Sequence, residues 1–168
     1  LVIITTGTGA ARALEQVMPE VSRIGFMAES VRIPTATVSL IILNVTFQSG
    51  MTADGNPLID RESINGIYRQ ASQCEARGLV RYTEEQNVSA DLKGEDAAVV
   101  IEAAETHTRT GFVDVEIPAE VNGDQQQDQV RTCRIPVTHV KIFGWYDNEL
   151  GSYTNRLGQL TSHISGVL

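Results

Sequence analysis

The feature that most constrains the fold is the segment 37–47, a nearly continuous run of Val, Ile and Leu in the first third of the chain. Such a run is typical of a β-strand that is buried on both faces, because neither face alternates toward polar residues. The segment is far shorter than the run of about 18 apolar residues that a membrane span requires. We therefore expect a sheet strand here, with protein covering both of its sides.

Further segments have the character of strands. Within one of them, Val113, Val115 and Ile117 alternate with Asp114 and Glu116, which is typical of an antiparallel strand with one face in water. The polar stretch 118–129 is predicted to be an exposed hairpin loop. The alternating segment is 111–117, and the other strand candidates are residues 1–6 (a short buried strand or extended run), 26–33, 79–82, 88–91, 97–103, 130–135 and 137–145.

Three segments have helical spacing. Thr8 is predicted to be the N-cap of a helix that Pro19 ends, and Asp60 is predicted to cap a second helix. The third helix covers about 148–164, where apolar residues recur on one face at Tyr153, Leu157, Leu160 and Ile164. Helices packed on one face of a mainly antiparallel sheet form an α+β layer architecture, which is the fold class that the sequence predicts.

Charge and cysteine content exclude several classes of partner. The formal net charge is −8 with only 13 Lys and Arg, which argues against binding to nucleic acid or to an anionic membrane surface. No run of about 18 apolar residues is present, so no membrane span is expected. Cys74 and Cys133 are too few for a disulfide framework and lack zinc-site spacing. We expect two reduced, buried thiols in a cytoplasmic protein.

Two features of the first 35 residues suit anion binding. Thr8 and Gly9 precede a predicted helix, whose first-turn N–H groups are unpaired and whose dipole favours negative charge. Arg32 carries a planar guanidinium that can bind a phosphate with two hydrogen bonds. The simpler interpretations are a plain N-cap with a closely packed glycine, and a surface or salt-bridged arginine.

A third motif lies near the other end of the chain, where residues 145–153 read Trp-Tyr-Asp-Asn-Glu-Leu-Gly-Ser-Tyr. Together with Gly-Thr-Gly-Ala-Ala-Arg at 7–12 and Val-Arg-Ile-Pro-Thr at 31–35, it resembles the phosphorylating glyceraldehyde-3-phosphate dehydrogenase family. The three motifs stand in the order of that family and at about its spacing. Residues 104–136 depart from the family pattern and are longer, which suggests an enlarged, divergent branch.

The resemblance assigns roles to five residues. Thr8, Gly9 and Arg32 would contact phosphate, either the C3 phosphate of the substrate or the attacking inorganic phosphate. Asn148 would hydrogen-bond the nicotinamide carboxamide, for which an amide offers both a donor and an acceptor. Tyr153 would lie near the nicotinamide, although Ser152 lengthens the spacing by one residue. The alternative for Asn148 is helix capping, a role that asparagine favours.

The same resemblance implies what this chain lacks. The nucleophilic cysteine of the family lies in a Ser-Cys-Thr-Thr-Asn motif that is followed by a catalytic histidine, and neither motif occurs here. We expect a C-terminal piece of a larger enzyme that is inactive alone. Residues 1–146 would be part of the catalytic domain, and residues 147–168 would form a helix that packs on an absent nucleotide-binding domain.

By resemblance, the parent would be a homotetrameric oxidoreductase of glycolysis and gluconeogenesis. Its substrates would be glyceraldehyde 3-phosphate and inorganic phosphate, with NAD or NADP as cofactor, bound mainly by residues outside this chain. The aldehyde would form a thiohemiacetal on the cysteine, pass a hydride to the cofactor and leave as an acyl phosphate. The alternatives are an erythrose-4-phosphate dehydrogenase and a non-catalytic paralogue that acts as a binding module.

Overall fold

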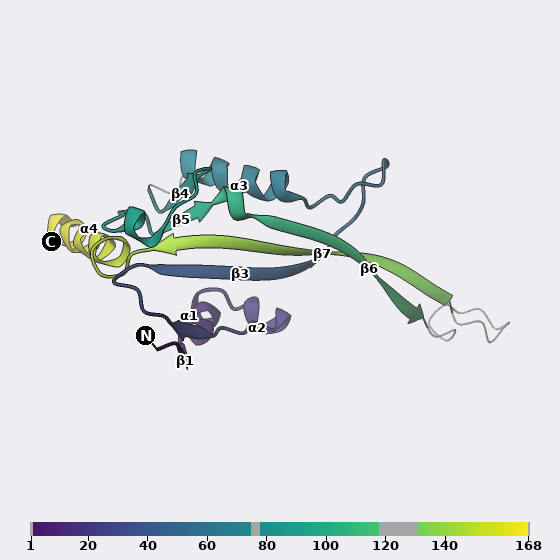
Figure 1. The fold of residues 1–168 in the computed structure, drawn as a ribbon, viewed down its shortest axis with the longest axis horizontal. Helices are drawn as coiled ribbons and strands as arrows, with labels where there is room; N and C mark the ends of the chain where they lie inside the picture. The colour runs from purple at the N-terminus through teal and green to yellow at the C-terminus, as the bar shows by residue number, and fades with distance from the viewer. Residues whose placement is uncertain (1, 75–77, 118–130, 168) are drawn as a thin grey trace. The chain divides into compact units, whose positions relative to one another are not determined.

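The computed structural model describes residues 2–74, 78–117 and 131–167. The chain forms two compact units, one up to Ala36 and the other from Thr37 onward (Figure 1), and each unit is described by itself. The predicted hairpin loop at 118–129 falls outside the described residues. The α+β class is confirmed, because helices accompany a five-stranded sheet that is mainly antiparallel.

The first unit is a pair of short strands with two helices between them. Strand β1 pairs antiparallel with β2, so that Ile4 lies opposite Arg32. The predicted first helix is confirmed, but Gly9 rather than Thr8 is its N-cap. The prediction of a buried strand at residues 1–6 is wrong in burial, since the Ile4 side chain is 51% exposed. The elements are β1 (Ile4–Thr6), α1 (Ala10–Val17), α2 (Val21–Ile24) and β2 (Ser30–Arg32).

The second unit is built on one sheet with the strand order β3-β7-β5-β4, and β6 also pairs with β7. Only β4 and β5 run parallel to each other; β7 is antiparallel to β3, β5 and β6. Strand β7 is therefore the centre on which the sheet is assembled. The strands are β3 (Ser39–Gln48), β4 (Val80–Thr83), β5 (Val99–Glu102), β6 (His107–Ile117) and β7 (Arg131–Tyr146).

Strand β7 joins the two strands predicted at 130–135 and 137–145 into one, and Pro136 does not interrupt it. The carbonyl oxygen of Pro136 accepts from Ser49 N at 3.4 Å, just beyond the last β3 residue. Since the nitrogen of a strand residue faces the same side as its carbonyl, the Pro136 nitrogen faces Ser49 at the end of β3, while the pairing of β7 with β6 continues past it. Figure 1 shows β6 and β7 extending together beyond the other strands.

Helix α3 (Arg61–Gln73) covers one face of the sheet (Figure 1). Its Ile64 and Tyr68 pack on a buried cluster formed by Ile101, Val140 and Ile142. The predicted cap is confirmed, because the Asp60 carboxylate accepts from Ser63 N at 2.8 Å. The apolar spacing of this helix and its cap were both legible in the sequence because each depends only on neighbouring residues.

A second, smaller core lies on the opposite side of β5, where Leu92, Ala97 and Val100 pack with Val38 and Trp145. Within this core Val38 has φ 72°, a left-handed conformation that is unfavourable for a β-branched residue. The predicted strand at 88–91 is wrong: a 3₁₀ helix η1 (Ser89–Leu92) forms instead. The Asp91 carboxylate accepts from Val88 N at 2.9 Å, and such a local bond favours a turn. A second 3₁₀ helix, η2 (Ala103–Glu105), follows β5.

Strand β3 is not buried on both faces, which corrects the prediction from its apolar run. It stands at one end of the strand order, and Leu40, Ile41 and Ile42 are 41%, 47% and 51% exposed.

The prediction of buried thiols is also wrong, since Cys74 and Cys133 are both free and exposed. The last element is helix α4 (Ser152–Val167). None of the helices in the described part of the chain is long and apolar enough to cross a membrane.

Candidate functional site

Thr8 and Gly9 lie at the start of α1 in the first unit. The Ala10 N–H donates to Thr8 Oγ1 at 3.2 Å, and the carbonyl oxygen of Gly9 accepts the first helical bond from Ala13 N at 3.0 Å. Both residues are exposed, and a Cβ built on Gly9 would meet no atom within 4 Å. The N-terminus of α1 is therefore open to an anion, which the helix dipole and the N–H groups of its first turn would attract.

Arg32 is the last residue of β2 and its side chain is exposed. Its Cα partner is Ile4, which precedes Thr8 by four residues and therefore by at most about 14 Å. The fold thus brings the predicted phosphate-binding residues into one small unit without direct contact between them.

Asn148 stands in the turn between β7 and α4, with its side chain exposed. Helix α4 begins at Ser152, so Asn148 is not part of a helix start, and the alternative of helix capping finds no support in its position. Within the described residues, no hydrogen bond to the Asn148 amide is recorded. Both its donor and its acceptor are available to a ligand.

The residue before it, Asp147, has no exposed surface and organises the turn. Its Oδ1 accepts from Glu149 N at 2.9 Å and from Leu150 N at 3.1 Å, and its Oδ2 accepts from Gly94 N at 2.7 Å. Burial acts to raise the pKa of Asp147. The three N–H groups and the nearby charge of Lys93 together outweigh burial and hold the pKa below its ordinary value.

Ser152 ties the other end of this turn to residues 95–97. Its N–H donates to Glu95 O at 2.9 Å, and its hydroxyl donates to Ala97 O at 2.7 Å and accepts from Asp147 N at 3.2 Å. The approach is close, because a Cβ on Gly151 would lie 2.1 Å from Glu95 O. Only glycine fits at position 151 without displacing the neighbouring backbone.

Tyr153 is in the first turn of α4 and its side chain is 65% exposed. Its ring stands edge-on to the ring of Tyr146, with centroids 6.1 Å apart and an interplanar angle of 87°, a favoured aromatic geometry. The fold therefore places Asn148 in the turn before α4 and Tyr153 in the first turn of that helix. The roles of Asp147 and Ser152 were not predicted, although an Asp just before a Gly-containing turn is a recognisable signal for local backbone bonding.

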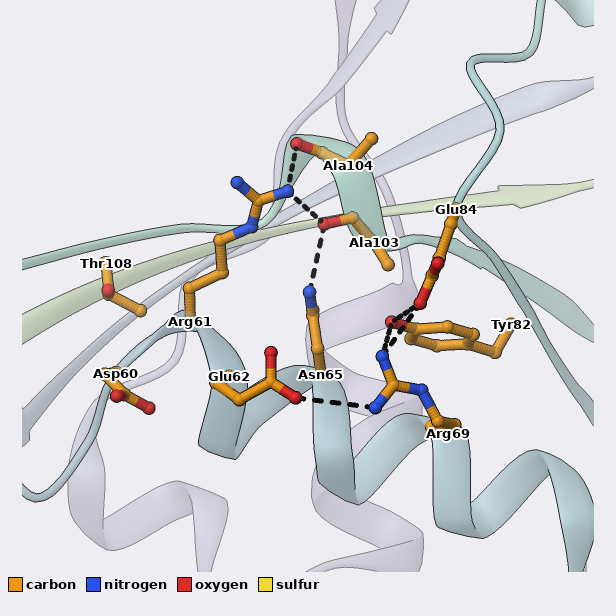
Figure 2. A pocket seen from close by; sticks show the side chains of 10 residues that line it. All are labelled: Asp60, Arg61, Glu62, Asn65, Arg69, Tyr82, Glu84, Ala103, Ala104 and Thr108. Carbon is orange, nitrogen blue, oxygen red and sulfur yellow. Dashed lines mark hydrogen bonds and ion pairs between the residues drawn. The ribbon is translucent and has the colours of Figure 1, made fainter.

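A hollow in the described part of the chain lies elsewhere, between α3 and the segment around η2, with a volume of about 560 Å³. Figure 2 shows Arg69 reaching Glu62, Tyr82 and Glu84, and Arg61 donating to two backbone carbonyl oxygens. None of the predicted site residues lines this hollow. Its charged groups are engaged with one another or with backbone, so we interpret it as structural.

No metal site accompanies these groups within residues 2–74, 78–117 and 131–167, where no cluster of three or more His, Cys, Asp or Glu could hold an ion.

A sequence profile described as "Glyceraldehyde 3-phosphate dehydrogenase, C-terminal domain" matches residues 1–148. The chain belongs to this family. The match includes the start of α1, strand β2 and Asn148, and helix α4 follows the matched region.

Curated relatives carry the same family name over almost the whole chain. Glyceraldehyde-3-phosphate dehydrogenase 1 of Bacillus cereus is 31% identical over 97% of this chain and 38% of its own length. The Neurospora crassa glyceraldehyde-3-phosphate dehydrogenase is 30% identical over 98% of this chain and 38% of its own length. The cytosolic glyceraldehyde-3-phosphate dehydrogenase of Chlamydomonas reinhardtii is 30% identical over 97% of this chain and 37% of its own length. The chain therefore spans less than two fifths of the length of these relatives.

Proposed function

We propose that this chain supplies phosphate-binding and nicotinamide-orienting residues to a phosphorylating glyceraldehyde-3-phosphate dehydrogenase. Family membership over residues 1–148 supports the class of enzyme. The observation that carries the proposal is the first unit, where an open helix N-terminus at Gly9 and the exposed Arg32 lie on paired strands and the helix that follows. Both groups favour an anion, and the fold holds them in one small unit.

Within this proposal, Thr8, Gly9 and Arg32 hold either the phosphate of the substrate or the attacking inorganic phosphate. The N–H groups at the start of α1 stabilise the negative charge without any cost in side-chain ordering. The Arg32 guanidinium adds charge-assisted hydrogen bonds. Two groups on different elements restrict the phosphate in both position and orientation. An attacking inorganic phosphate, or the phosphate that aligns the substrate, needs both restrictions.

The second part of the proposal concerns the cofactor, NAD or NADP. The exposed Asn148 amide has a donor and an acceptor without recorded partners, and it therefore fits the carboxamide of a nicotinamide ring. The cofactor would accept the hydride when bound. Asn148 would fix which face of the ring is presented, and Tyr153 would lie beside it on the start of α4.

Helix α4 would pack on a nucleotide-binding domain outside this chain. Its face carries four exposed apolar side chains at helical spacing, Tyr153, Leu157, Leu160 and Ile164, which are between 49% and 66% exposed. A continuous apolar stripe of this kind is normally covered by protein. The catalytic cysteine and histidine would also come from the part of the enzyme that precedes these residues, so the 168-residue chain alone would be inactive.

The test is Arg32→Ala in the longer enzyme, assayed with glyceraldehyde 3-phosphate and with unphosphorylated glyceraldehyde. A charge-assisted phosphate contact predicts a loss of roughly ten- to a hundredfold in kcat/KM. Arg32→Lys should recover only part of it, because an ammonium cannot reproduce the planar fork. Arg23→Ala, which removes an exposed arginine from α2 of the same unit, is the matched control.

The two substrates separate the two phosphate roles. If Arg32 holds the phosphate of the substrate, the loss should be much smaller with glyceraldehyde. If it holds inorganic phosphate, the loss should persist with both substrates and KM for phosphate should rise. Unchanged kcat/KM for Arg32→Ala with both substrates, in a folded variant, would show that this arginine does not bind phosphate.

A further inference from the structure

Two buried side chains flank the turn that carries Asn148. Asp147 precedes it and is 0% exposed, and Ser152 follows it and is 2% exposed. We propose that Asp147 and Ser152 are positioning residues that hold residues 148–151 in one conformation and so fix the direction of the Asn148 amide. This inference rests on the proposed role of Asn148 toward the nicotinamide.

Asp147 closes the turn from within. By accepting from Glu149 N and Leu150 N, its Oδ1 draws the backbone into a loop with Asn148 at its tip. Its Oδ2 accepts from Gly94 N, which belongs to a different segment of the unit. Both carboxylate oxygens are therefore committed to backbone N–H groups. Asp147 is 0% exposed, so a ligand does not reach its oxygens, and we infer that its effect on the cofactor acts through the turn that carries Asn148.

Ser152 holds the far end of the same turn against residues 95–97. Its backbone N–H donates to Glu95 O and its hydroxyl donates to Ala97 O, two residues further along, and the hydroxyl also accepts from Asp147 N. The last of these bonds joins the two buried residues directly. Arg156, one turn further along α4, donates to Gly78 O at 2.6 Å and to Asp96 O at 3.3 Å. The start of α4 is thus bonded at several points to the sheet unit, and Asn148 is exposed in the turn between β7 and α4.

This arrangement predicts how substitutions at Asp147 and Ser152 affect cofactor binding. Loosening the turn lets the Asn148 amide sample several directions, so that only a fraction of the protein presents the binding-competent one. The apparent association constant for the cofactor is then the intrinsic constant multiplied by that fraction. The change should therefore appear mainly in KM for NAD, and it should depend on the presence of the Asn148 side chain.

The kinetic experiment uses the longer enzyme with Asp147→Asn, Ser152→Ala and Asn148→Ala, singly and in pairs. We expect a roughly tenfold rise in KM for NAD in each single variant, the size expected for a lost hydrogen bond. In the Asn148→Ala background, Ser152→Ala should add less than about twofold, because residues that act as a unit are not additive. Ser72→Ala, which removes a hydroxyl bonded within α3, is the control and should leave KM unchanged.

A second readout needs no cofactor and uses amide hydrogen exchange on the 168-residue chain. The amides of Glu149 and Leu150 should exchange at least roughly tenfold faster in Asp147→Asn and in Ser152→Ala. They should be unchanged in Asn148→Ala, whose side chain is not recorded in any of these bonds. Exchange in α3 should be the same in all variants. Faster exchange throughout the chain would show a general structural role and would overturn the proposal.

The outcomes separate this inference from the proposed function. If Asn148→Ala leaves KM for NAD unchanged, the role proposed for Asn148 fails, and exchange at Glu149 and Leu150 alone still decides whether the turn is held as described. If Asn148→Ala raises KM but Ser152→Ala does not, or if the two effects add fully, the positioning role is overturned. Should Asp147→Asn prevent folding, Ser152→Ala decides alone, because it leaves the bond from its N–H to Glu95 O in place.

Discussion

At Asp147, burial and hydrogen bonding act in opposite directions on one carboxylate. Burial favours the neutral acid, and three backbone N–H groups favour the ion. The lowered pKa shows that the N–H groups prevail. Ionised Asp147 is therefore stabilised by folding, and its contribution to the free energy of unfolding depends on pH.

The sign of this dependence follows from the direction of the shift. Because the folded pKa lies below the ordinary value of 3.8, the contribution is fully present above that value and is lost as pH falls through the folded pKa. At pH 7, Asp147→Asn should lower the free energy of unfolding by about 1.5–3 kcal/mol, as for hydrogen bonds to a charged group. Urea unfolding of the wild type and the variant should show this difference shrinking below about pH 4.

Asp54 provides the matched control, because it is an exposed carboxylate in the turn after β3. Asp54→Asn makes the same change in charge and should alter the free energy of unfolding by less than about 0.5 kcal/mol. A difference between wild type and Asp147→Asn that stays constant from pH 7 to pH 3 would contradict the account of Asp147.

At the scale of elements, helix α3 is the part of the fold that the sequence defines most completely. Its capping box involves Asp60 and Ser63 only, with Ser63 Oγ also accepting from Asp60 N at 2.9 Å. Its apolar side chains Ile64 and Tyr68 pack on the buried cluster of the sheet. Caps and stripes of this kind depend on residues within one or two turns, which is why sequence alone predicts them.

The cap can be tested by mutation. Asp60→Ala should lower the free energy of unfolding by about 1 kcal/mol, because the Ser63 N–H loses its acceptor. Asp60→Ser, which restores an oxygen acceptor, should retain most of the stability. Amide exchange in the first turn of α3, measured beside urea unfolding, locates the effect. An unchanged unfolding midpoint in Asp60→Ala would show that the cap contributes nothing.

Elements whose character depends on distant residues were predicted less well. The apolar run in β3 indicated a strand correctly, but its exposure follows from its place at the end of the strand order, which no local pattern encodes. Residues 88–91 have strand-like composition, yet the Asp91 carboxylate bonds Val88 N and forms a 3₁₀ turn. The strands expected at 130–135 and 137–145 form the single strand β7, because Pro136 lies opposite the end of β3, which the sequence does not reveal.

The same distinction applies to the candidate site. Thr8, Gly9, Arg32 and Asn148 were selected from short motifs and from resemblance, and the structure leaves all four exposed. Asp147 and Ser152 were not predicted from the sequence, because their partners lie about 50 residues earlier in the chain. These partners are Gly94, Glu95 and Ala97. Residues that touch a ligand can be found by motif. Residues that hold them in place depend on the tertiary fold.

For the whole molecule, we propose that this chain is the anion-binding and cofactor-orienting part of an enzyme whose nucleophile lies outside it. The chain contains neither the Ser-Cys-Thr-Thr-Asn motif nor the histidine that follows it in the family. Binding groups cannot replace a missing nucleophile and base. The pure 168-residue chain is therefore expected to show no turnover, and the longer enzyme is expected to require phosphate.

The most direct test is the initial rate of nicotinamide reduction with glyceraldehyde 3-phosphate while the phosphate concentration is varied. We predict saturable, phosphate-dependent reduction by the longer enzyme, with erythrose 4-phosphate and NADP assayed beside glyceraldehyde 3-phosphate and NAD. The 168-residue chain should give no rate above background with any of these combinations. A rate independent of phosphate in the longer enzyme, or turnover by the pure chain that is lost on mutating Cys74 or Cys133, would contradict the account.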